Sequence, residues 1–301
     1  MLRFAVAIAL FFSAIYICIA VFSNVLESTE GPKLNANSSI DVVAYLVRRE
    51  SLLNLSVSLH YLFHSFNDRL ALPVLVFYES DDLSEAEARR ALRAAIGLRR
   101  LALVEFHAVA FDFPSGYDPL LAHPVGLHEA ARFPGYHHMC AFWLRGLFLH
   151  PRLSGVRYVL RLDADSYLVG RIEYDLFERL ARRGVRYAYR ARFGETCCVR
   201  HLTRFLHSYV RANGLSDVVA SELRWLADPE HRLAVFPPDD HLIQMFYNNM
   251  EVLHVPTFRD DADVWRFADT AWRDPLLGEF GIYKVFNILI IRINTSFLFI
   301  F

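Results

Sequence analysis

The most constraining feature of the sequence is a β-strand pattern that ends in two carboxylates. Residues 156–162 read VRYVLRL, an alternation of β-forming residues that is typical of a buried strand. Asp163 and Asp165 follow directly, with Ala164 between them. Ligands of open α/β sheets bind beyond the carboxyl ends of the strands, so we expect both acids to face a cleft.

Two carboxylates one residue apart suit a hard divalent cation, because such cations prefer oxygen ligands and often also bind substrate phosphates. The pattern therefore predicts a metal-dependent enzyme that acts on a diphosphate-bearing substrate. The alternative interpretation is a strand-end turn in which Asp163 and Asp165 cap backbone amides. A second Asp-x-Asp, at 261–263, follows no strand pattern, and we interpret it as a solvated loop or a helix start.

The chain before these acids alternates between strand and helix patterns. We expect strands at 40–47, 73–78 and 103–109, separated by helices over 52–66 and 84–97. This alternation is typical of a parallel sheet whose strands are joined by right-handed helical crossovers.

The remaining elements extend the same organisation. A helix over 140–149 leads into the acid-tipped strand, and a further strand is expected at 185–190. Additional helices are predicted over 202–212, 218–226 and 241–247. The expected architecture is a nucleotide-binding α/β fold with its acids at a strand end.

Composition limits the class of protein. At 301 residues, we expect one domain or two small ones. A hydrophobic content of 54% and an aromatic content of 14% can fill a large core, which excludes wholesale disorder. The net charge of −1 argues against a general nucleic-acid binder, since such domains carry a clear basic excess.

The amino terminus predicts a membrane anchor. Residues 4–22 form an apolar stretch close to the roughly 20 residues that span a bilayer as a helix. Residues 1–3 include Arg3 and acids follow the stretch, so the positive-inside rule makes 1–3 a cytosolic tail and the bulk of the chain lumenal. Polar residues 23–39 are interpreted as a lumenal stem. A cleaved signal peptide is the alternative, and both interpretations lead to the secretory pathway.

Several ordered segments resemble one known family. They are Leu46–Arg48 (LVR), Tyr136–Phe142 (YHHMCAF), Arg161–Asp165 (RLDAD), Glu173–Phe177 (EYDLF), Met250–Val252 (MEV) and Phe258–Arg259 (FR). They resemble the Leu-Ala-Arg, Tyr-x-x-Met-Cys-Arg-Phe, Arg-Val-Glu-Pro-Asp, Asn-Tyr-Asp-x-Phe, Phe-Glu-Ile and Phe-Arg segments of glycosyltransferase family 15, the fungal-type α-1,2-mannosyltransferases of the Golgi. The resemblance covers roughly residues 40–283.

The resemblance implies a GT-A-type nucleotide-sugar-binding fold, with a mixed, mainly parallel sheet flanked by helices. It implies a single-pass type II protein of the Golgi membrane, held there by its N-terminal helix, with a lumenal catalytic domain over residues 40–283. The implied reaction transfers mannose from GDP-mannose, with Mn²⁺ as cofactor and retention of the α configuration. The implied acceptor is a mannoside on a glycoprotein or glycolipid.

The resemblance also implies roles for individual residues. Asp163 and Asp165 are implied to hold Mn²⁺, and Glu251 is implied to act as the nucleophile or to stabilise an oxocarbenium-like state. Arg48 and Arg161 are implied to contact the donor, and Tyr136 to contact the substrate. The alternative interpretations are an Arg161 paired with a nearby acid, a solvated surface Glu251 and a Tyr136 that caps its helix.

Two departures from the family pattern leave alternatives open. The match stops at Tyr283, before the family's metal-binding histidine, and we hypothesise that residues 284–301 are a mispredicted extension such as translated intron. Asp163 stands where the family has glutamate, which shortens the carboxylate by one methylene. The alternatives are therefore a GT-A transferase with another nucleotide sugar and an inactive, membrane-tethered glycan-binding homologue.

Overall fold

The structure, a computed structural model, describes residues 40–112, 134–195, 205, 208–214, 243–273 and 296–299. The predicted anchor and stem lie outside these residues, as does most of the tail over 284–301. Among the helices that the structure describes, none has the length and apolarity to cross a membrane.

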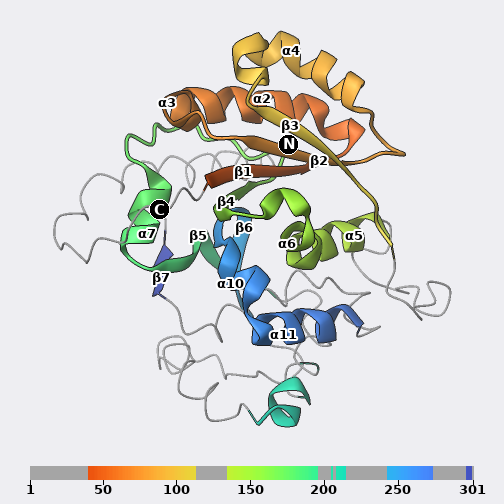
Figure 1. The fold of residues 1–301 in the computed structure, drawn as a ribbon, viewed down its shortest axis with the longest axis vertical. Helices are drawn as coiled ribbons and strands as arrows, with labels where there is room; N and C mark the ends of the chain where they lie inside the picture. Colours follow the sequence, from red (N-terminus) through yellow and green to blue (C-terminus); the bar gives the residue numbers. More distant parts are fainter. Residues whose placement is uncertain are drawn as a thin grey trace, which may run out of the picture.

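The described strands form one seven-stranded sheet in the order β3-β2-β1-β4-β6-β5-β7 (Figure 1). Within it, β6 runs antiparallel to β4 and β5, and the other neighbouring strands pair in parallel. This mixed, mainly parallel sheet confirms the predicted fold class. The strands are β1 Ile40–Val47, β2 Val74–Glu79, β3 Val104–Val109, β4 Val156–Leu162, β5 Val185–Glu195, β6 Ile243–His254 and β7 Ser296–Phe299.

Helices cover both faces of the sheet (Figure 1). One apolar core lies between the sheet and α2, α4 and α7, and the other lies between the sheet and α5, α6, α10 and α11. The α-helices are α2 Leu52–Leu62, α3 Asp68–Leu70, α4 Glu85–Leu101, α5 Gly135–Ala141, α6 Leu147–Leu149, α7 Leu176–Arg182, α10 Val255–Asp260 and α11 Ala262–Arg273. Short 3-10 turns are η2 Arg49–Ser51 and η6 Pro151–Leu153, and π-helical turns are η3 Phe63–Asn67 and η5 Phe142–Gly146.

Local sequence signals explain several of these boundaries. Ser84 and Glu87 form a reciprocal capping box at the start of α4, which satisfies amides that have no partner within the helix. Gly97, where the helix was predicted to end, has φ of 76° and marks a kink, beyond which the helix resumes to Leu101. The second Asp-x-Asp is a helix start as interpreted, because Asp261 Oδ1 accepts from the amides of Asp263 and Val264 at the head of α11.

The predicted helix over 241–247 is wrong, because residues 243–247 belong to strand β6. This strand pairs with β4 on one side and β5 on the other, and such long-range pairing overrides a weak local helical pattern. The helix predicted over 140–149 exists but begins earlier, at Gly135, and it contains the π-helical turn η5.

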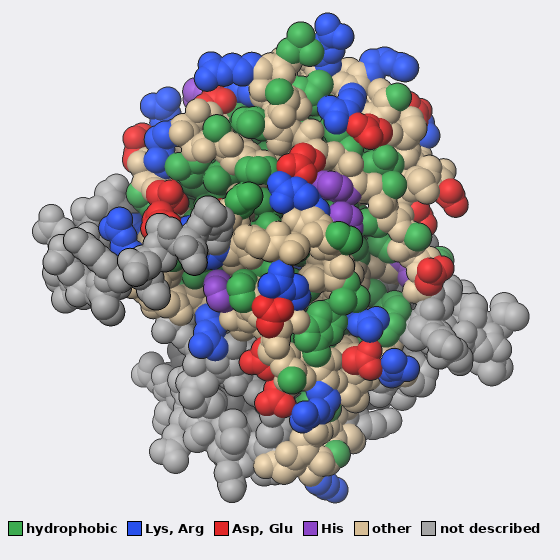
Figure 2. All heavy atoms as spheres, in the orientation of Figure 1, with side chains coloured by type: hydrophobic (Ala, Val, Ile, Leu, Met, Phe, Trp, Pro, Cys, Tyr) green, Lys and Arg blue, Asp and Glu red, His purple; other side chains and the backbone are tan. Residues whose placement is uncertain are grey.

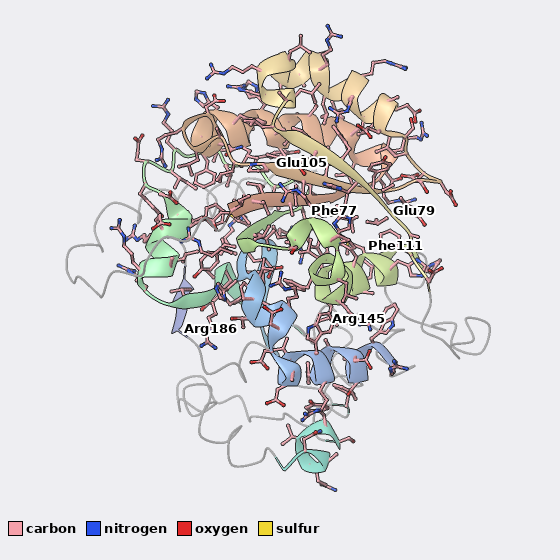
Figure 3. The ribbon with its side chains drawn as sticks, in the orientation of Figure 1. Phe77, Glu79, Glu105, Phe111, Arg145 and Arg186 are labelled. Atoms are coloured by element: carbon pink, nitrogen blue, oxygen red, sulfur yellow. The ribbon has the colours of Figure 1, made fainter. Side chains whose placement is uncertain are left out.

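The helical layer formed by α5, η5, α6, α10 and α11 is held together by polar as well as apolar contacts. Arg145 of η5 lies between this turn and α11 (Figure 3), and its Nη2 is 3.3 Å from Asp269 Oδ1.

On the molecular face shown in Figure 2, acidic and basic side chains are interspersed.

Candidate active site

The strand order places a topological switch point between β1 and β4. From β1 the chain builds outward through β2 to β3, and then returns to place β4 on the other side of β1. The two strands are parallel neighbours, so their carboxyl ends meet at one edge, where β1 is followed by Arg48 and β4 by Asp163. Ligands of open α/β sheets bind in the crevice at such a point.

The two acids lie on a turn that is anchored to two elements. The amide of Ser166 donates to the Asp163 carbonyl at 2.9 Å, which closes the turn through the main chain. The Asp163 amide and the Ser166 hydroxyl both donate to the Asn249 carbonyl of β6, each at 3.0 Å. Ser58 of α2 donates its hydroxyl to the Ser166 carbonyl at 2.5 Å. We call residues 163–166 the acid turn.

The acid turn presents its two carboxylates differently. The Asp163 side chain is 30% exposed and accepts from Arg161 at 3.2 Å, whereas Asp165 is exposed. The structure therefore leaves both acids within reach of solvent at the switch point, and the main-chain bonds hold the turn that carries them.

Three buried polar side chains behind the acid turn form a connected set with Asp163. Tyr187 Oη donates to Glu251 Oε2 at 2.7 Å, and Arg161 Nη1 donates to Glu251 Oε1 at 2.8 Å. Arg161 Nη2 then donates to Asp163 Oδ1 at 3.2 Å. Arg161 and Glu251 are each 1% exposed. We call Tyr187, Glu251, Arg161 and Asp163 the buried polar chain.

Sheet register produces the centre of this chain. Arg161 on β4 and Glu251 on β6 are directly opposed partners, so their side chains emerge on the same face at short range. Burial raises the pKa of Glu251, whereas the Arg161 guanidinium and the Tyr187 hydroxyl stabilise its ionised form and limit that rise. The ring of Trp143, in η5, lies 4.3 Å from the Arg161 guanidinium carbon, a cation–π distance.

The structure brings three of the predicted site residues into direct contact: Asp163, Arg161 and Glu251. Arg161 pairs with acids, as its alternative interpretation expected. The interpretation of Glu251 as a solvated surface residue is wrong, because this residue is buried on β6 between two strands. The missed strand β6 explains the error.

The other predicted residues lie around this group. Asp165 is on the acid turn, and Arg48 follows β1 with its side chain 63% exposed and Nη1 3.3 Å from Glu50. Tyr136 is partly buried in the first turn of α5, whose N-cap position is held by Pro134.

Two residues of the site had no signal in the sequence. Tyr187 was assigned to a strand and Trp143 to a helix, but neither was linked to Arg161 or Glu251. The bond from Tyr187 to Glu251 spans 64 positions of sequence and depends on β5 and β6 being neighbours. This contact could have been found only by predicting that β6 pairs with β4 on one side and with β5 on the other.

The donor set of the acid turn fits a hard divalent cation. Asp163 and Asp165 supply carboxylate oxygens from one anchored turn. Water and phosphate oxygens can complete the coordination of Mn²⁺ or Mg²⁺ at such a site. Within the described residues, no group of three or more His, Cys, Asp or Glu is arranged to hold a metal. The stretch directly after Tyr283, which the resemblance would expect to carry a histidine, lies outside those residues.

Comparison with known proteins supports the resemblance. No family model matches the chain. The chain is 24% identical over 171 residues to the O-glycoside α-1,2-mannosyltransferase homolog 5 of Schizosaccharomyces pombe, and the match covers 54% of this chain but only 38% of that protein.

Solved structures share the fold. Core-mannan synthase A of Aspergillus fumigatus, in its Mn/GDP form, superposes with a TM-score of 0.69 at 17% identity, over 89% of this chain and 76% of the other. The mannosyltransferase Ktr4p of Saccharomyces cerevisiae, in complex with GDP, gives 0.67 at 17% identity, over 88% and 71%. The chain is thus similar in sequence to an α-1,2-mannosyltransferase homolog and shares its fold with two mannosyltransferases, as the resemblance to family 15 predicts.

Proposed function

We propose that this chain is a glycosyltransferase that moves mannose from GDP-mannose to a mannoside acceptor on a glycoprotein or glycolipid, with formation of an α-1,2 linkage and retention of configuration. The observation that carries the proposal is the anchored acid turn at the switch point between β1 and β4. Its support is that the fold is shared with two mannosyltransferases, one solved in a Mn/GDP form and one with GDP.

The donor site of the proposal is built on the carboxyl ends of β1 and β4. Asp163 and Asp165 would hold Mn²⁺, and the bound cation would supply positive charge to offset the negative charge of the departing GDP. Arg48, exposed at the end of β1, would contact the phosphates, where an always-charged planar guanidinium is suited to bidentate bonding.

The role that we propose for Arg161 differs from the one that the resemblance implies, which is a direct contact with the donor. Its side chain is 2% exposed, and its two Nη atoms donate to Glu251 and Asp163. A buried guanidinium between two carboxylates orients both of them, so we propose that Arg161 serves the donor site by orienting Asp163.

Glu251 is the proposed catalytic carboxylate, and Tyr136 the proposed acceptor contact. In a retaining transfer, Glu251 would act as a nucleophile or would stabilise an oxocarbenium-like state. Both roles require the ionised carboxylate. Arg161 and Tyr187 stabilise that form with one bond to each Glu251 oxygen.

The proposal also includes a location. Residues 4–22 would anchor the chain in the Golgi membrane as a type II protein, with residues 23–39 as the stem and the domain from residue 40 in the lumen. The apolar pattern of 4–22 and the placement of Arg3 support it. Protease protection of the domain in sealed Golgi vesicles, lost on adding detergent, is the expected result; digestion in intact vesicles would contradict it.

The activity is tested by GDP release from the full-length chain in detergent. We expect release from GDP-mannose to require both Mn²⁺ and an α-mannoside acceptor, and Asp163→Asn to reduce it at least a hundredfold, as for loss of an important electrostatic group. Asp263→Asn is the matched control, because Asp263 belongs to the other Asp-x-Asp and pairs with Arg266 on α11. No release by the wild type, or equal release by the two variants, would overturn the proposal.

A second candidate function is transfer of a different sugar. Asp163 is one methylene shorter than the glutamate of the family pattern, so the geometry around the cation, and with it the donor, can differ. A panel of GDP- and UDP-sugars under the same conditions separates the two candidates, since the preferred donor gives the highest kcat/KM.

A further inference from the structure

We propose that Tyr187 is a positioning residue of this active site, and that it acts through Glu251 and Arg161 on the acid turn. The inference rests on the proposed function, because it assigns Tyr187 a task in the same site. Its basis is the geometry of the buried polar chain, which crosses three adjacent strands and ends at Asp163.

The sheet brings Tyr187 to Glu251 in a diagonal arrangement. Glu251 on β6 is directly opposite Arg161 on β4 and Tyr189 on β5. Tyr187 is two positions before Tyr189, so it lies on the same face of β5, and a long aromatic side chain can reach a diagonal neighbour. Its hydroxyl donates to Glu251 Oε2 at 2.7 Å.

Packing fixes the position of the Tyr187 hydroxyl. The residue is 1% exposed, its ring is stacked with that of Tyr189 at 6.0 Å between centroids, and Phe258 of α10 contacts it edge-on at 6.4 Å. A buried ring in contact with two aromatic neighbours in a close-packed core has little room to change rotamer. The hydroxyl is therefore a fixed donor for one oxygen of Glu251.

This donor leaves the other oxygen of Glu251 to Arg161. With Oε2 bonded to Tyr187 and Oε1 to Arg161, the plane of the Glu251 carboxylate is set by two partners. The guanidinium is planar, so fixing its Nη1 side also fixes the direction in which Nη2 meets Asp163, and Trp143 lies 4.3 Å from its carbon.

Charge balance gives the direction of the effect. One guanidinium serves two carboxylates, and its bond to Glu251, at 2.8 Å, is shorter than its bond to Asp163, at 3.2 Å. Without the Tyr187 hydroxyl, the buried Glu251 carboxylate would lose a donor and depend more strongly on Arg161. The bond to Asp163 would then weaken, and Asp163 would be less well oriented toward a cation.

The test compares Tyr187→Phe with Tyr158→Phe in the full-length chain. Tyr158 is an equally buried tyrosine whose hydroxyl donates to the Val185 carbonyl at 2.6 Å, in the core on the other face of the sheet. Both variants lose one buried hydroxyl bond and keep the ring, so both should lower Tm by a few degrees. Only Tyr187→Phe should weaken Mn²⁺-dependent GDP binding, measured by calorimetry, and lower kcat.

For Tyr187→Phe we expect Mn²⁺-dependent GDP affinity and kcat to fall tenfold to hundredfold, roughly the range found when a hydrogen-bond partner of a metal ligand is removed. We also expect Tyr187→Phe to add less than twofold in a Glu251→Gln background, because its effect is transmitted through Glu251. If Tyr187→Phe and Tyr158→Phe agree in binding and turnover, or if the effects of Tyr187→Phe and Glu251→Gln multiply, the inference is overturned while the proposed function stands. A wild-type chain without Mn²⁺-dependent GDP binding overturns the proposed function itself.

Discussion

Strand β4 carries two arginines that each sit between two acids, one near each end of the strand. At the amino end, Arg157 pairs with Asp41 through two bonds, of 3.1 and 2.6 Å, and with Glu178 at 2.6 Å. Toward the carboxyl end, Arg161 pairs with Glu251 and Asp163. The Arg157 side chain is 23% exposed, and that of Arg161 is 2% exposed.

The comparison shows that similar residue types have different consequences at the two ends. Water and salt reach the Arg157 guanidinium and its outer partner Glu178, so their pair is screened and should contribute modestly to stability. The Arg161–Glu251 pair is closed to water, and a buried ion pair recovers little more than its own desolvation cost. Stabilisation therefore explains the Arg161–Glu251 pair poorly, whereas its position behind the acid turn fits the orienting role proposed for Arg161.

The largest expected effect is on stability at the buried end. Arg161→Met leaves the Glu251 carboxylate buried without its cation, and should lower the free energy of unfolding by about 3–5 kcal/mol. Arg157→Met, at the open end, should cost about 1–2 kcal/mol. Chemical denaturation of both variants measures the difference, and equal losses would remove the contrast between the two ends.

The next effect separates ligand binding from stability. Asp165→Asn should weaken Mn²⁺-dependent GDP binding about tenfold or more, with little change in Tm, because Asp165 is exposed. Asp41→Asn should do the reverse, since the Asp41 side chain is 10% exposed and bonds Arg157 and the Tyr158 amide. Calorimetry and thermal unfolding on both variants provide the check; a binding defect in Asp41→Asn would mean that the two ends are not independent.

A smaller effect concerns pH at the amino end. Burial, with added repulsion from Arg186 (labelled in Figure 3) and Arg157, lowers the pKa of His254 to about 4. The unfolded chain takes up this proton near pH 6.5 and the folded protein only near pH 4, so stability is complete above pH 6.5 and falls as the pH drops through that window. The slope from this one group is at most about 1.4 kcal/mol per pH unit.

His254→Phe should flatten that part of the pH profile. The ring of His254 lies 5.0 Å from that of Tyr158, a contact that phenylalanine can keep, although the bond from Nδ1 to Thr257 is lost. Denaturation at several pH values between 4 and 7 compares wild type and variant. Parallel profiles would show that His254 does not supply the pH dependence.

The smallest effect is expected at Glu178, the outer partner of Arg157. Its side chain is 46% exposed, so Glu178→Gln should lower the free energy of unfolding by no more than about 1 kcal/mol, and less at high salt. Turnover should remain at the wild-type level. A large or salt-independent loss would show that the open end behaves like the buried one.

Much of the fold could be predicted from the sequence, because its signals are local. The strand at 40–47 has the predicted bounds, and the strand that Asp163 follows was found from its alternation. The acid pair could also be located, since a strand followed directly by carboxylates is a pattern within one short segment. The motifs that resemble family 15 led to Arg161 and Glu251 as site residues.

The sequence by itself thus determined the βα alternation, the acids at the end of β4 and the identity of most candidate site residues. The tertiary structure decided which of them meet. Arg161 and Glu251 are 90 positions apart, and their contact exists because β6, part of which had been assigned to a helix, enters the sheet antiparallel between β4 and β5. Strand pairing joins distant segments through main-chain bonds that carry no side-chain signature, so the partners of a buried side chain follow from register and not from local pattern.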